Sequence, residues 1–238
     1  MRQQDADSYT WVIREVHEEA RQVRSFVMEA VSERPPFISG QYLTVRLPGF
    51  EPAEGKSYSI SSSEEDPFIR LTVKEAGPFS RALYGHVVGD TLTTSAPYGF
   101  FYPEEGEAQN LVFIAGGIGI TPCMGILETL AREGYPKDMT LFYSNRTQED
   151  ITFQGRLEAL ASSLPRLRVL HHITREPVDG TPYREGRIVG DSVLHSLTHH
   201  HTDADYFVCG SIDFTKNLWK ELRNVGVPTE KIYTEGFY

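Results

Sequence analysis

Cysteine is scarce in this chain, with Cys123 and Cys209 the two thiols among 238 residues. An iron–sulfur cluster takes about four thiolate ligands, and zinc sites commonly use a C-x-x-C pair, so the sequence predicts neither centre. A structural disulfide is not expected in a cytoplasmic protein. Long hydrophobic runs are missing as well, since no stretch approaches the roughly 20 apolar residues that span a membrane.

Positive charge is also in short supply. The chain has 33 acidic residues against 23 lysines and arginines, which leaves a formal net charge of -10. This excess disfavours binding to nucleic acid or to an anionic membrane surface, because both repel a negative protein. The first residues are polar and acidic and do not resemble a signal peptide, so we expect a cytoplasmic protein. A hydrophobic content of 39% over this length is enough for two globular domains.

Short alternating segments, separated by turn residues, fill the first hundred residues. The predicted elements are strands at 9–16, 23–31, 41–47, 56–61, 68–74 and 91–96, and a short helix at 80–84. Such a series is typical of a closed or nearly closed antiparallel β-barrel. The sequence therefore predicts a barrel domain over residues 1–105.

From residue 106 onward, apolar strands alternate with helices. Strands are predicted at 111–115, 139–143, 167–174, 205–209 and 231–234, and helices at 122–132, 153–162, 191–199 and 215–224. Alternation of this kind predicts an α/β domain with a doubly wound parallel sheet over residues 106–238.

The sequence G-G-I-G at 116–119 separates the first strand of this second domain from its helix. Thr121 is expected to cap the helix, with Pro122 as its first residue. Free backbone amides and the positive end of a helix dipole would then meet at one point, which suits a phosphate. The fingerprint G-x-G-x-x-G is not matched, because Pro122 occupies the place of the third glycine. A tight turn without a ligand is the alternative.

Four motifs follow one another along the chain. They are Lys56-Ser57-Tyr58-Ser59; Thr72-Val73-Lys74 with Gly77-Pro78-Phe79-Ser80; Gly116 to Pro122; and Cys209-Gly210-Ser211 with Glu235-Gly236-Phe237. In this order they resemble the R-x-Y-S, G-x-x-S, G-G-x-G-x-x-P, C-G and terminal E-x-aromatic motifs of the ferredoxin–NADP reductase family of flavoenzymes. The resemblance extends over nearly the whole chain. It implies an FAD-binding barrel followed by an NAD(P)-binding α/β domain.

For the barrel, the resemblance implies that Tyr58 packs on the isoalloxazine and that Ser59 reaches flavin N5. Lys56 replaces the family's arginine, which keeps the charge for the flavin phosphates but loses the bidentate fork. FAD is favoured over FMN, because the G-x-x-S turn offers a second set of phosphate amides. The implied flavin-binding residues are Lys56, Ser57, Tyr58, Ser59, Thr72, Val73, Lys74, Gly77, Phe79 and Ser80. Two aromatic residues further along, Tyr98 and Phe100, are interpreted as packing residues.

For the second domain, the resemblance implies that the glycine turn faces the pyrophosphate of a nicotinamide nucleotide and that Thr121 touches both cofactors. Cys209 is expected beside the nicotinamide C4, with Glu235 assisting there, so the implied catalytic residues are Ser59, Cys209 and Glu235. Either Phe237 or Tyr238 would cover the flavin. The implied residues of the turn and of the C-G motif are Gly116, Gly117, Gly119, Thr121, Pro122, Cys209 and Gly210.

The choice between NADPH and NADH depends on the loops after the second and third strands. An NAD site usually offers a carboxylate to the ribose 2′-hydroxyl, and no acid follows the second strand. Two arginines and two hydroxyls favour a 2′-phosphate instead. These residues are Ser144, Arg146, Thr174 and Arg175. A solvated loop is the alternative, so NADH stays open.

Histidines gather at 171–172 and at 199–201, with His195 four residues before His199. On a helix, His195 and His199 would share a face. No carboxylate or cysteine completes a ligand set at a recognisable spacing, so no metal site is predicted.

Together these observations predict a flavin-dependent oxidoreductase that moves hydride from NAD(P)H to bound FAD. Electrons would then pass to a separate acceptor: ferredoxin, flavodoxin or an oxygenase component. An acidic carrier would need a local basic patch, for which the candidates are Arg14, Arg21, Arg24 and Arg46. The alternatives are a flavin reductase with diffusing flavin, an electron-transfer subunit of a larger complex, and a nucleotide-binding module without chemistry.

Overall fold

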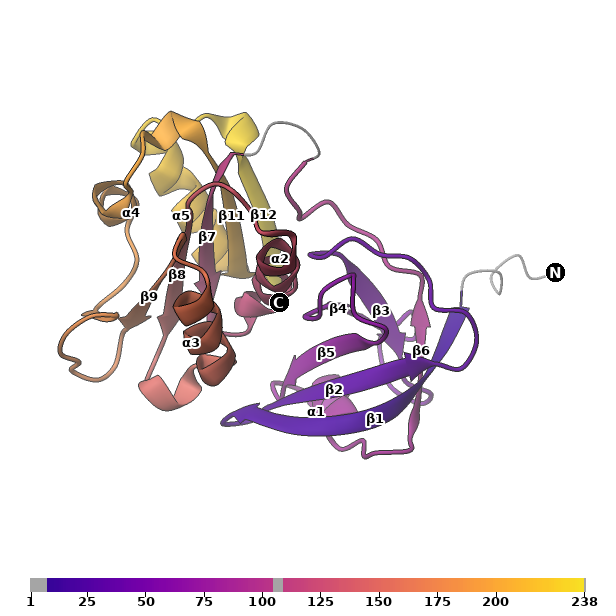
Figure 1. Ribbon diagram of the computed structural model, residues 1–238. Helices are drawn as coiled ribbons and strands as arrows, with labels where there is room; N and C mark the ends of the chain where they lie inside the picture. The colour runs from indigo at the N-terminus through magenta and orange to yellow at the C-terminus, as the bar shows by residue number, and fades with distance from the viewer. Residues whose placement is uncertain (1–7, 105–108, 238) are drawn as a thin grey trace. The chain divides into compact units, whose positions relative to one another are not determined.

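The computed structural model describes residues 8–104 and 109–237 (Figure 1). The chain divides into two compact units, one containing residues 1–102 and 124–129, the other 103–123 and 130–238. The predicted domain boundary between 105 and 106 lies outside the described residues.

The first unit is built on a six-stranded antiparallel sheet with the strand order β4-β3-β6-β1-β2-β5. A bridge between Ile60 and Leu71 joins the end of β4 to β5, so the sheet curls toward closure. The predicted barrel-like fold is confirmed. Its elements are β1 (Ser8–Ala20), β2 (Val23–Ala30), β3 (Tyr42–Arg46), β4 (Lys56–Ser59), β5 (Ile69–Lys74), α1 (Pro78–Tyr84) and β6 (Thr91–Ser95).

Alternating side chains of these strands fill the interior of the first unit. Trp11 and Ile13 on β1 are fully buried, and the Trp11 indole donates a hydrogen bond of 2.8 Å to the Thr94 hydroxyl. That bond satisfies the one polar atom that the large ring takes into the core. Helix α1 adds Phe79 and Leu83 to the same cluster.

An ion pair is buried in the first unit, between Arg70 on β5 and Glu128 in the middle of α2 (Ile120–Glu133). The side chains are 4% and 14% exposed, and Nη1 and Oε2 are 3.4 Å apart. One residue further along α2, the Thr129 hydroxyl lies 2.7 Å from the hydroxyls of both Ser39 and Ser63. Polar contacts therefore tie the middle of this helix into the first unit.

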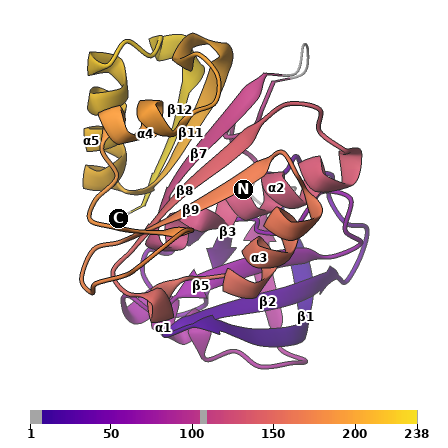
Figure 2. The ribbon, with the colours of Figure 1, turned by 60° about the vertical axis from the view of Figure 1, so that its left-hand side comes forward.

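The second unit contains a six-stranded sheet with the order β10-β9-β8-β7-β11-β12, in which every pairing is parallel. The chain starts at β7, moves outward to β10 and then crosses to β11 on the other side of β7. Figure 2 shows α3 on one side of the sheet and α4 and α5 on the other. This is the predicted doubly wound architecture. Its strands are β7 (Asn110–Gly116), β8 (Met139–Asn145), β9 (Leu167–Ile173), β10 (Tyr183–Glu185), β11 (Ala204–Ser211) and β12 (Ile232–Phe237), and its further helices are α3 (Gln154–Ser163), α4 (Gly190–Ser196) and α5 (Ile212–Asn224).

The strands of this sheet bury side chains on both faces. Val112 and Ile114 belong to the cluster that packs against Leu218 and Leu222 of α5. On the opposite face, aromatic rings stack across three neighbouring strands: Phe113 and Phe207 lie 5.4 Å apart between centroids, and Phe207 and Tyr233 lie 4.8 Å apart. Burial on both faces explains why the strands appear in the sequence as continuous apolar runs.

Helix α4, strand β10 and strand β12 differ from expectation. Helix α4 ends at Ser196, because the next residue, Leu197, is extended, so His195 and His199 do not share a helix face. Strand β10 was not predicted, since its three residues form a strand only by pairing with β9. Strand β12 continues to Phe237, because parallel pairing with β11 extends that far.

The interpretation of Phe100 as a packing residue was wrong, because the structure leaves it 85% exposed. Tyr98 is 45% exposed and packs against Tyr42, with ring centroids 4.3 Å apart. Across residues 8–104 and 109–237, the helices are too short or too polar to cross a bilayer.

We expect Glu128→Ala to lower the free energy of unfolding by about 3–5 kcal/mol, because it removes the carboxylate of a buried ion pair with the Arg70 guanidinium. Urea unfolding of the two proteins measures the difference. The matched control is Glu29→Ala, which breaks the exposed 2.7 Å pair with Arg14 and should cost at most about 1 kcal/mol. Equal losses in the two variants would contradict the importance of the buried pair.

Candidate functional site

The sheet of the second unit reverses its strand order between β7 and β11. In open α/β sheets, ligands bind outside the carboxyl ends of the strands at this point. The register pairs Ala115 of β7 with Cys209 of β11, and Cys209 with Glu235 of β12. The structure thus brings the glycine turn, the C-G motif and the terminal glutamate to one edge of the sheet.

The glycine turn forms a short 3-10 segment, Gly117–Gly119, directly before α2. Gly117 adopts a positive φ of 53°, and a Cβ there would meet no heavy atom within 4 Å, so its surroundings are open. A Cβ on Gly119 would lie 2.3 Å from the Cys209 carbonyl oxygen. Glycine is therefore required at 119, because the start of α2 lies almost against the backbone of β11.

The predicted start of the helix was wrong. Helix α2 begins at Ile120 and its N-cap is Gly119, so Pro122 is the third helical residue. The Thr121 hydroxyl donates to the Ile118 carbonyl at 3.0 Å and does not cap the helix. A proline in the first turn removes no helical hydrogen bond, which makes both positions compatible with the sequence.

A second close packing accompanies the turn. The ring of Phe214, in the first turn of α5, would lie 3.2 Å from a Cβ on Gly116 and 2.6 Å from one on Gly210. Ser211 caps this helix by accepting a hydrogen bond of 3.4 Å from the Phe214 amide. Glycines of two separate motifs therefore leave room for one aromatic ring.

Both thiols are fully buried in the second unit. Burial raises the pKa of Cys209 well above its usual value, and the nearby Glu235 carboxylate raises it further. Burial and Glu235 also raise the pKa of Cys123. Cys209 therefore stays a neutral thiol at physiological pH, which suits contact with a reacting ring and not nucleophilic attack.

The loops after β8 and β9 are joined by backbone hydrogen bonds. The Arg175 amide donates to the Arg146 carbonyl at 2.8 Å, and the Thr174 amide donates to the Asn145 carbonyl at 3.0 Å. Both arginine side chains are exposed, and Ser144 is half-buried. The structure thus brings the four predicted 2′-phosphate residues to the ends of two neighbouring strands, with Ser144 in β8 and Arg146, Thr174 and Arg175 in the loops that follow β8 and β9.

In the first unit, Lys56 of β4 lies close to the first turn of α1. Its Nζ is 6.0 Å from the centroid of the Phe79 ring. Beside Lys56 on the strand, Ser57 is exposed, Tyr58 is half-buried and Ser59 is buried. Burial raises the pKa of Tyr58 to about 12, so its ring stays neutral. Lys56 of the K-S-Y-S motif therefore lies beside the G-P-F-S turn.

The G-P-F-S turn is held by its own serine. The Ser80 hydroxyl accepts hydrogen bonds of 2.9 Å from the amides of Ala76 and Gly77 and donates to the Gly77 carbonyl. A Cβ on Gly77 would meet nothing within 4 Å, so the turn is open to a ligand. With Lys56 beside it, the turn fits a phosphate group.

Thr72 and Val73, two other predicted residues of this region, are buried. Thr72 bonds through its hydroxyl to Ser25 and Ser61 at 2.8 Å, and Val73 is fully buried in the hydrophobic core. Lys74, the last residue of β5, is half-buried. Contacts from Thr72 and Val73 to a ligand would have to come from the backbone.

The predicted site residues belong to different units. Tyr58 and Ser59 are in the first unit and Cys209 and Glu235 in the second, so their convergence on two cofactors stays a prediction. At the end of β12, Phe237 is half-buried. Tyr238, its alternative as the flavin cover, lies outside the described residues.

Two candidate cations of the basic patch are neutralised within the first unit. Arg14 pairs with Glu29 at 2.7 Å, and Arg24 pairs with Glu18 at 2.5 Å. The Arg24 guanidinium also lies 4.2 Å from the centroid of the Tyr84 ring. These contacts leave Arg21 and Arg46 as the remaining candidates.

The neighbouring histidines 171 and 172 face opposite sides of β9. The His171 ring lies 5.4 Å from that of Tyr183, and the His172 ring lies 6.3 Å from that of Phe142. Burial lowers the pKa of both, that of His171 to about 4. Within the described part of the chain, no three metal-ligating side chains come together.

Sequence reasoning missed Tyr143, on β8. This fully buried side chain donates a hydrogen bond of 3.0 Å from its hydroxyl to the Gly117 carbonyl. A tyrosine within an apolar strand gives no signal of such a contact, because its partner Gly117 lies in the turn after another strand, β7.

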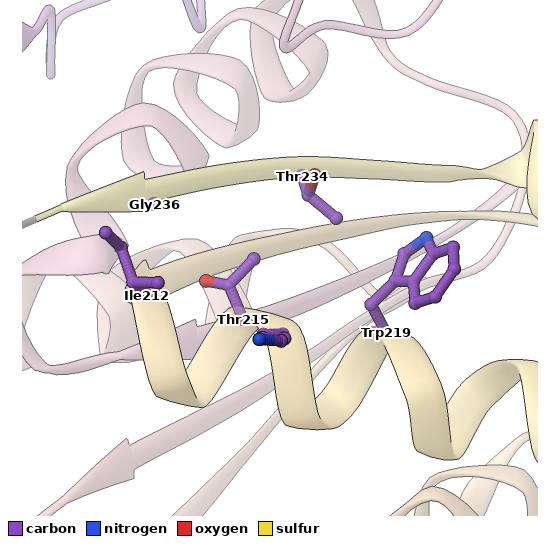
Figure 3. A pocket seen from close by; sticks show the side chains of 6 residues that line it. Ile212, Thr215, Trp219, Thr234 and Gly236 are labelled. Carbon is purple, nitrogen blue, oxygen red and sulfur yellow. The ribbon is translucent and has the colours of Figure 1, made fainter.

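A pocket of about 280 Å³ lies between α5 and β12 (Figure 3). Its lining comes from both elements and includes the Trp219 indole. None of these residues was predicted to contact a cofactor. The lining residues are Ile212, Thr215, Lys216, Trp219, Thr234 and Gly236. Because side chains alternate along β12, this pocket lies on the face of the sheet opposite to Glu235.

Comparison with known proteins gives three kinds of match. Residues 113–219 match the family model described as the oxidoreductase NAD-binding domain. The flavohemoprotein of Halalkalibacterium halodurans is 28% identical, over 98% of this chain and 66% of that protein. The ferredoxin reductase component of 3-ketosteroid-9-alpha-monooxygenase from Mycolicibacterium smegmatis is 32% identical, over 94% of this chain and 64% of that protein.

Among solved structures, the FAD/NAD binding domain of nitric oxide dioxygenase from Vibrio cholerae superposes with a TM-score of 0.86. It is 28% identical, and the match covers 97% of this chain and 99% of that one. This chain spans 56% to 66% of the length of the first three flavohemoproteins that it matches.

An antiparallel barrel-like unit joined to a doubly wound unit with a glycine turn at its switch point defines a two-domain reductase architecture. Residues 113–219 therefore form an oxidoreductase NAD-binding domain, and the chain is similar over nearly its whole length to a ferredoxin reductase component and to an FAD/NAD binding domain, in agreement with the four motifs.

We expect the free energy of unfolding to fall as the pH drops below about 6.5. His171 has a lower pKa in the folded state than in the unfolded chain, so the unfolded chain takes up a proton first. The contribution of His171 to the free energy of unfolding is fully present above pH 6.5 and is lost progressively down to about pH 4. Between pH 8 and 5.5 the loss from His171 should be about 1 kcal/mol.

Urea unfolding at these two pH values measures the effect. His171→Gln should show a smaller loss than the native chain, whereas His195→Gln, which changes an exposed histidine, should show the same loss. An unchanged pH dependence in His171→Gln would contradict the assignment.

Proposed function

We propose that this protein is a flavin-dependent NAD(P)H oxidoreductase that holds FAD and passes electrons to a separate acceptor. The observation that carries the proposal is the arrangement at the switch point of the second unit. There, parallel register pairs Cys209 with both Ala115 and Glu235, directly beside the glycine turn. Such an edge suits a dinucleotide whose pyrophosphate lies on the turn.

The second unit would bind and orient the nicotinamide nucleotide. Gly117 leaves space for the pyrophosphate, and the start of α2 offers it the positive end of a helix dipole. Cys209 would present a neutral thiol to the nicotinamide ring, and Glu235 would lie beside it. The exposed Arg146 and Arg175 favour NADPH, because guanidinium groups bind a phosphate bidentately.

The first unit would hold FAD. The Lys56 ammonium and the open turn at Gly77 suit the flavin pyrophosphate, while Tyr58 offers a neutral aromatic ring for stacking and Ser59 a hydroxyl for flavin N5. A bound flavin supplies hydride acceptance and one-electron release, and the protein supplies alignment. Phe237 would exclude water from the flavin.

The acceptor would be an oxygenase component or a small carrier such as ferredoxin or flavodoxin. A relative that is 32% identical is the ferredoxin reductase component of a monooxygenase, which supports a separate acceptor. The flavohemoprotein of Halalkalibacterium halodurans is longer than this chain, which matches 66% of its length. A cytoplasmic location stays a prediction.

A flavin reductase that uses flavin as a diffusing substrate is the second candidate. It is favoured by Lys56, because a lysine binds phosphate through one point charge where arginine forms a fork. Weaker phosphate binding would allow the flavin to leave.

The visible spectrum of the purified protein tests the two readings. A yellow preparation that releases FAD on denaturation, and that oxidises NADPH with ferricyanide as acceptor, is the expected result. A colourless protein that turns over only with added flavin would favour the flavin reductase. Absence of turnover even with added FAD would contradict both.

We expect Arg175→Ala to raise the KM for NADPH by about tenfold or more, because a hydrogen bond to a charged group contributes about 1.5–3 kcal/mol. The KM for NADH should change little. Steady-state oxidation of both nucleotides measures the difference. Arg166→Ala is the matched control, since Arg166 precedes β9 where Arg175 follows it, and pairs with Asp138. Equal effects of Arg175→Ala on the two nucleotides would remove Arg175 from phosphate recognition.

A further inference from the structure

The Tyr143 hydroxyl connects two loops that follow different strands. It donates a hydrogen bond of 3.0 Å to the Gly117 carbonyl, in the turn after β7. It also accepts a hydrogen bond of 3.2 Å from the Thr152 amide, in the segment after β8. The segment that ends at Thr152 includes Arg146 and begins where β8 ends. One hydroxyl thus bonds to the backbone of both parts of the proposed nucleotide site.

The Gly117 carbonyl is the one part of the turn whose orientation this bond sets. Gly117 has a positive φ, and a Cβ there would meet no heavy atom within 4 Å, so hydrogen bonds hold this peptide: its carbonyl accepts from the Tyr143 hydroxyl and from the Ile120 amide. Orienting the carbonyl also orients the following amide, because both belong to one rigid peptide plane. The amide groups of the turn are the atoms that would meet a pyrophosphate.

The donor is itself rigid. Tyr143 is fully buried within β8, and burial raises its pKa to about 12, so the hydroxyl keeps its proton. Its ring lies 5.9 Å from that of His171 on the neighbouring strand. Strands β7, β8 and β9 lie side by side in the sheet (Figure 2).

We propose that Tyr143 is a positioning residue, whose hydroxyl sets the glycine turn and the segment after β8 in the geometry that binds the nucleotide pyrophosphate. This inference rests on the proposed function, because it assigns Tyr143 to the nucleotide of that same site. Tyr143 does not touch the nucleotide and acts through Gly117 and Thr152.

The test is Tyr143→Phe, which removes the hydroxyl and keeps the ring. Binding of NADP⁺ is measured by calorimetry, and NADPH oxidation is measured with ferricyanide. We expect the Kd and the KM to rise about fivefold, as the loss of one hydrogen bond would give, with kcat within twofold of the native value. The KM for NADH should rise equally, because the pyrophosphate is common to both nucleotides.

Tyr206→Phe is the matched control. Tyr206, on β11, is also fully buried, and its hydroxyl donates a hydrogen bond of 3.0 Å to the His201 carbonyl. His201 is not part of the proposed site. Tyr206→Phe should lower the free energy of unfolding in urea by about as much as Tyr143→Phe does, but it should keep the native Kd for NADP⁺. Equal Kd values for the two variants would overturn the role of Tyr143, and so would a fall in kcat at unchanged KM.

The two proposals fail in different ways. Native protein that binds NADP⁺ but transfers no electrons would overturn the proposed function, while the Kd comparison would still decide the role of Tyr143. Native protein that binds no NADP⁺ and no NAD⁺ would overturn both.

Discussion

The second unit depends on one close approach, that of the start of α2 to the backbone of β11. A single methyl group at residue 119 would lie 2.3 Å from the Cys209 carbonyl, well inside any permitted contact. Only glycine lets the helix begin there. Because the helix begins there, the positive end of its dipole, the Cys209 thiol and the turn at Gly117 lie at the same edge of the sheet. The chemistry proposed for this unit follows from that steric constraint.

Elements with strong local signals could be predicted from the sequence. The strands of the second unit are apolar on both faces, and the barrel strands alternate, so both sheets were expected and both were found. The glycine turn was recognised by its position between strand and helix. What the sequence could not supply was the exact start of α2, because a glycine that caps a helix through backbone geometry looks like any other glycine in the turn.

Long-range pairing explains the other differences. Strand β10 has three residues and exists only through β9, and β12 extends to Phe237 only because β11 continues beside it. The contact of Tyr143 with Gly117 joins residues 26 positions apart, which no periodicity reveals. Phe100 shows the reverse case, an aromatic residue that the structure leaves exposed. Local pattern identifies elements, whereas tertiary contacts decide where they end and which side chains meet.

The electrostatics of the second unit agree with hydride chemistry and argue against covalent catalysis. Both thiols are buried, and the neighbouring Glu235 carboxylate makes ionisation of either still less favourable. A cysteine nucleophile needs the opposite environment, one that is positive and partly exposed. A neutral, polarizable sulfur can instead contact a nicotinamide ring whose charge changes during the reaction, without introducing a charge of its own. Under the proposed function, the Glu235 carboxylate, which adds to the effect of burial on the Cys209 thiol, would also face the positive charge of an oxidised nicotinamide.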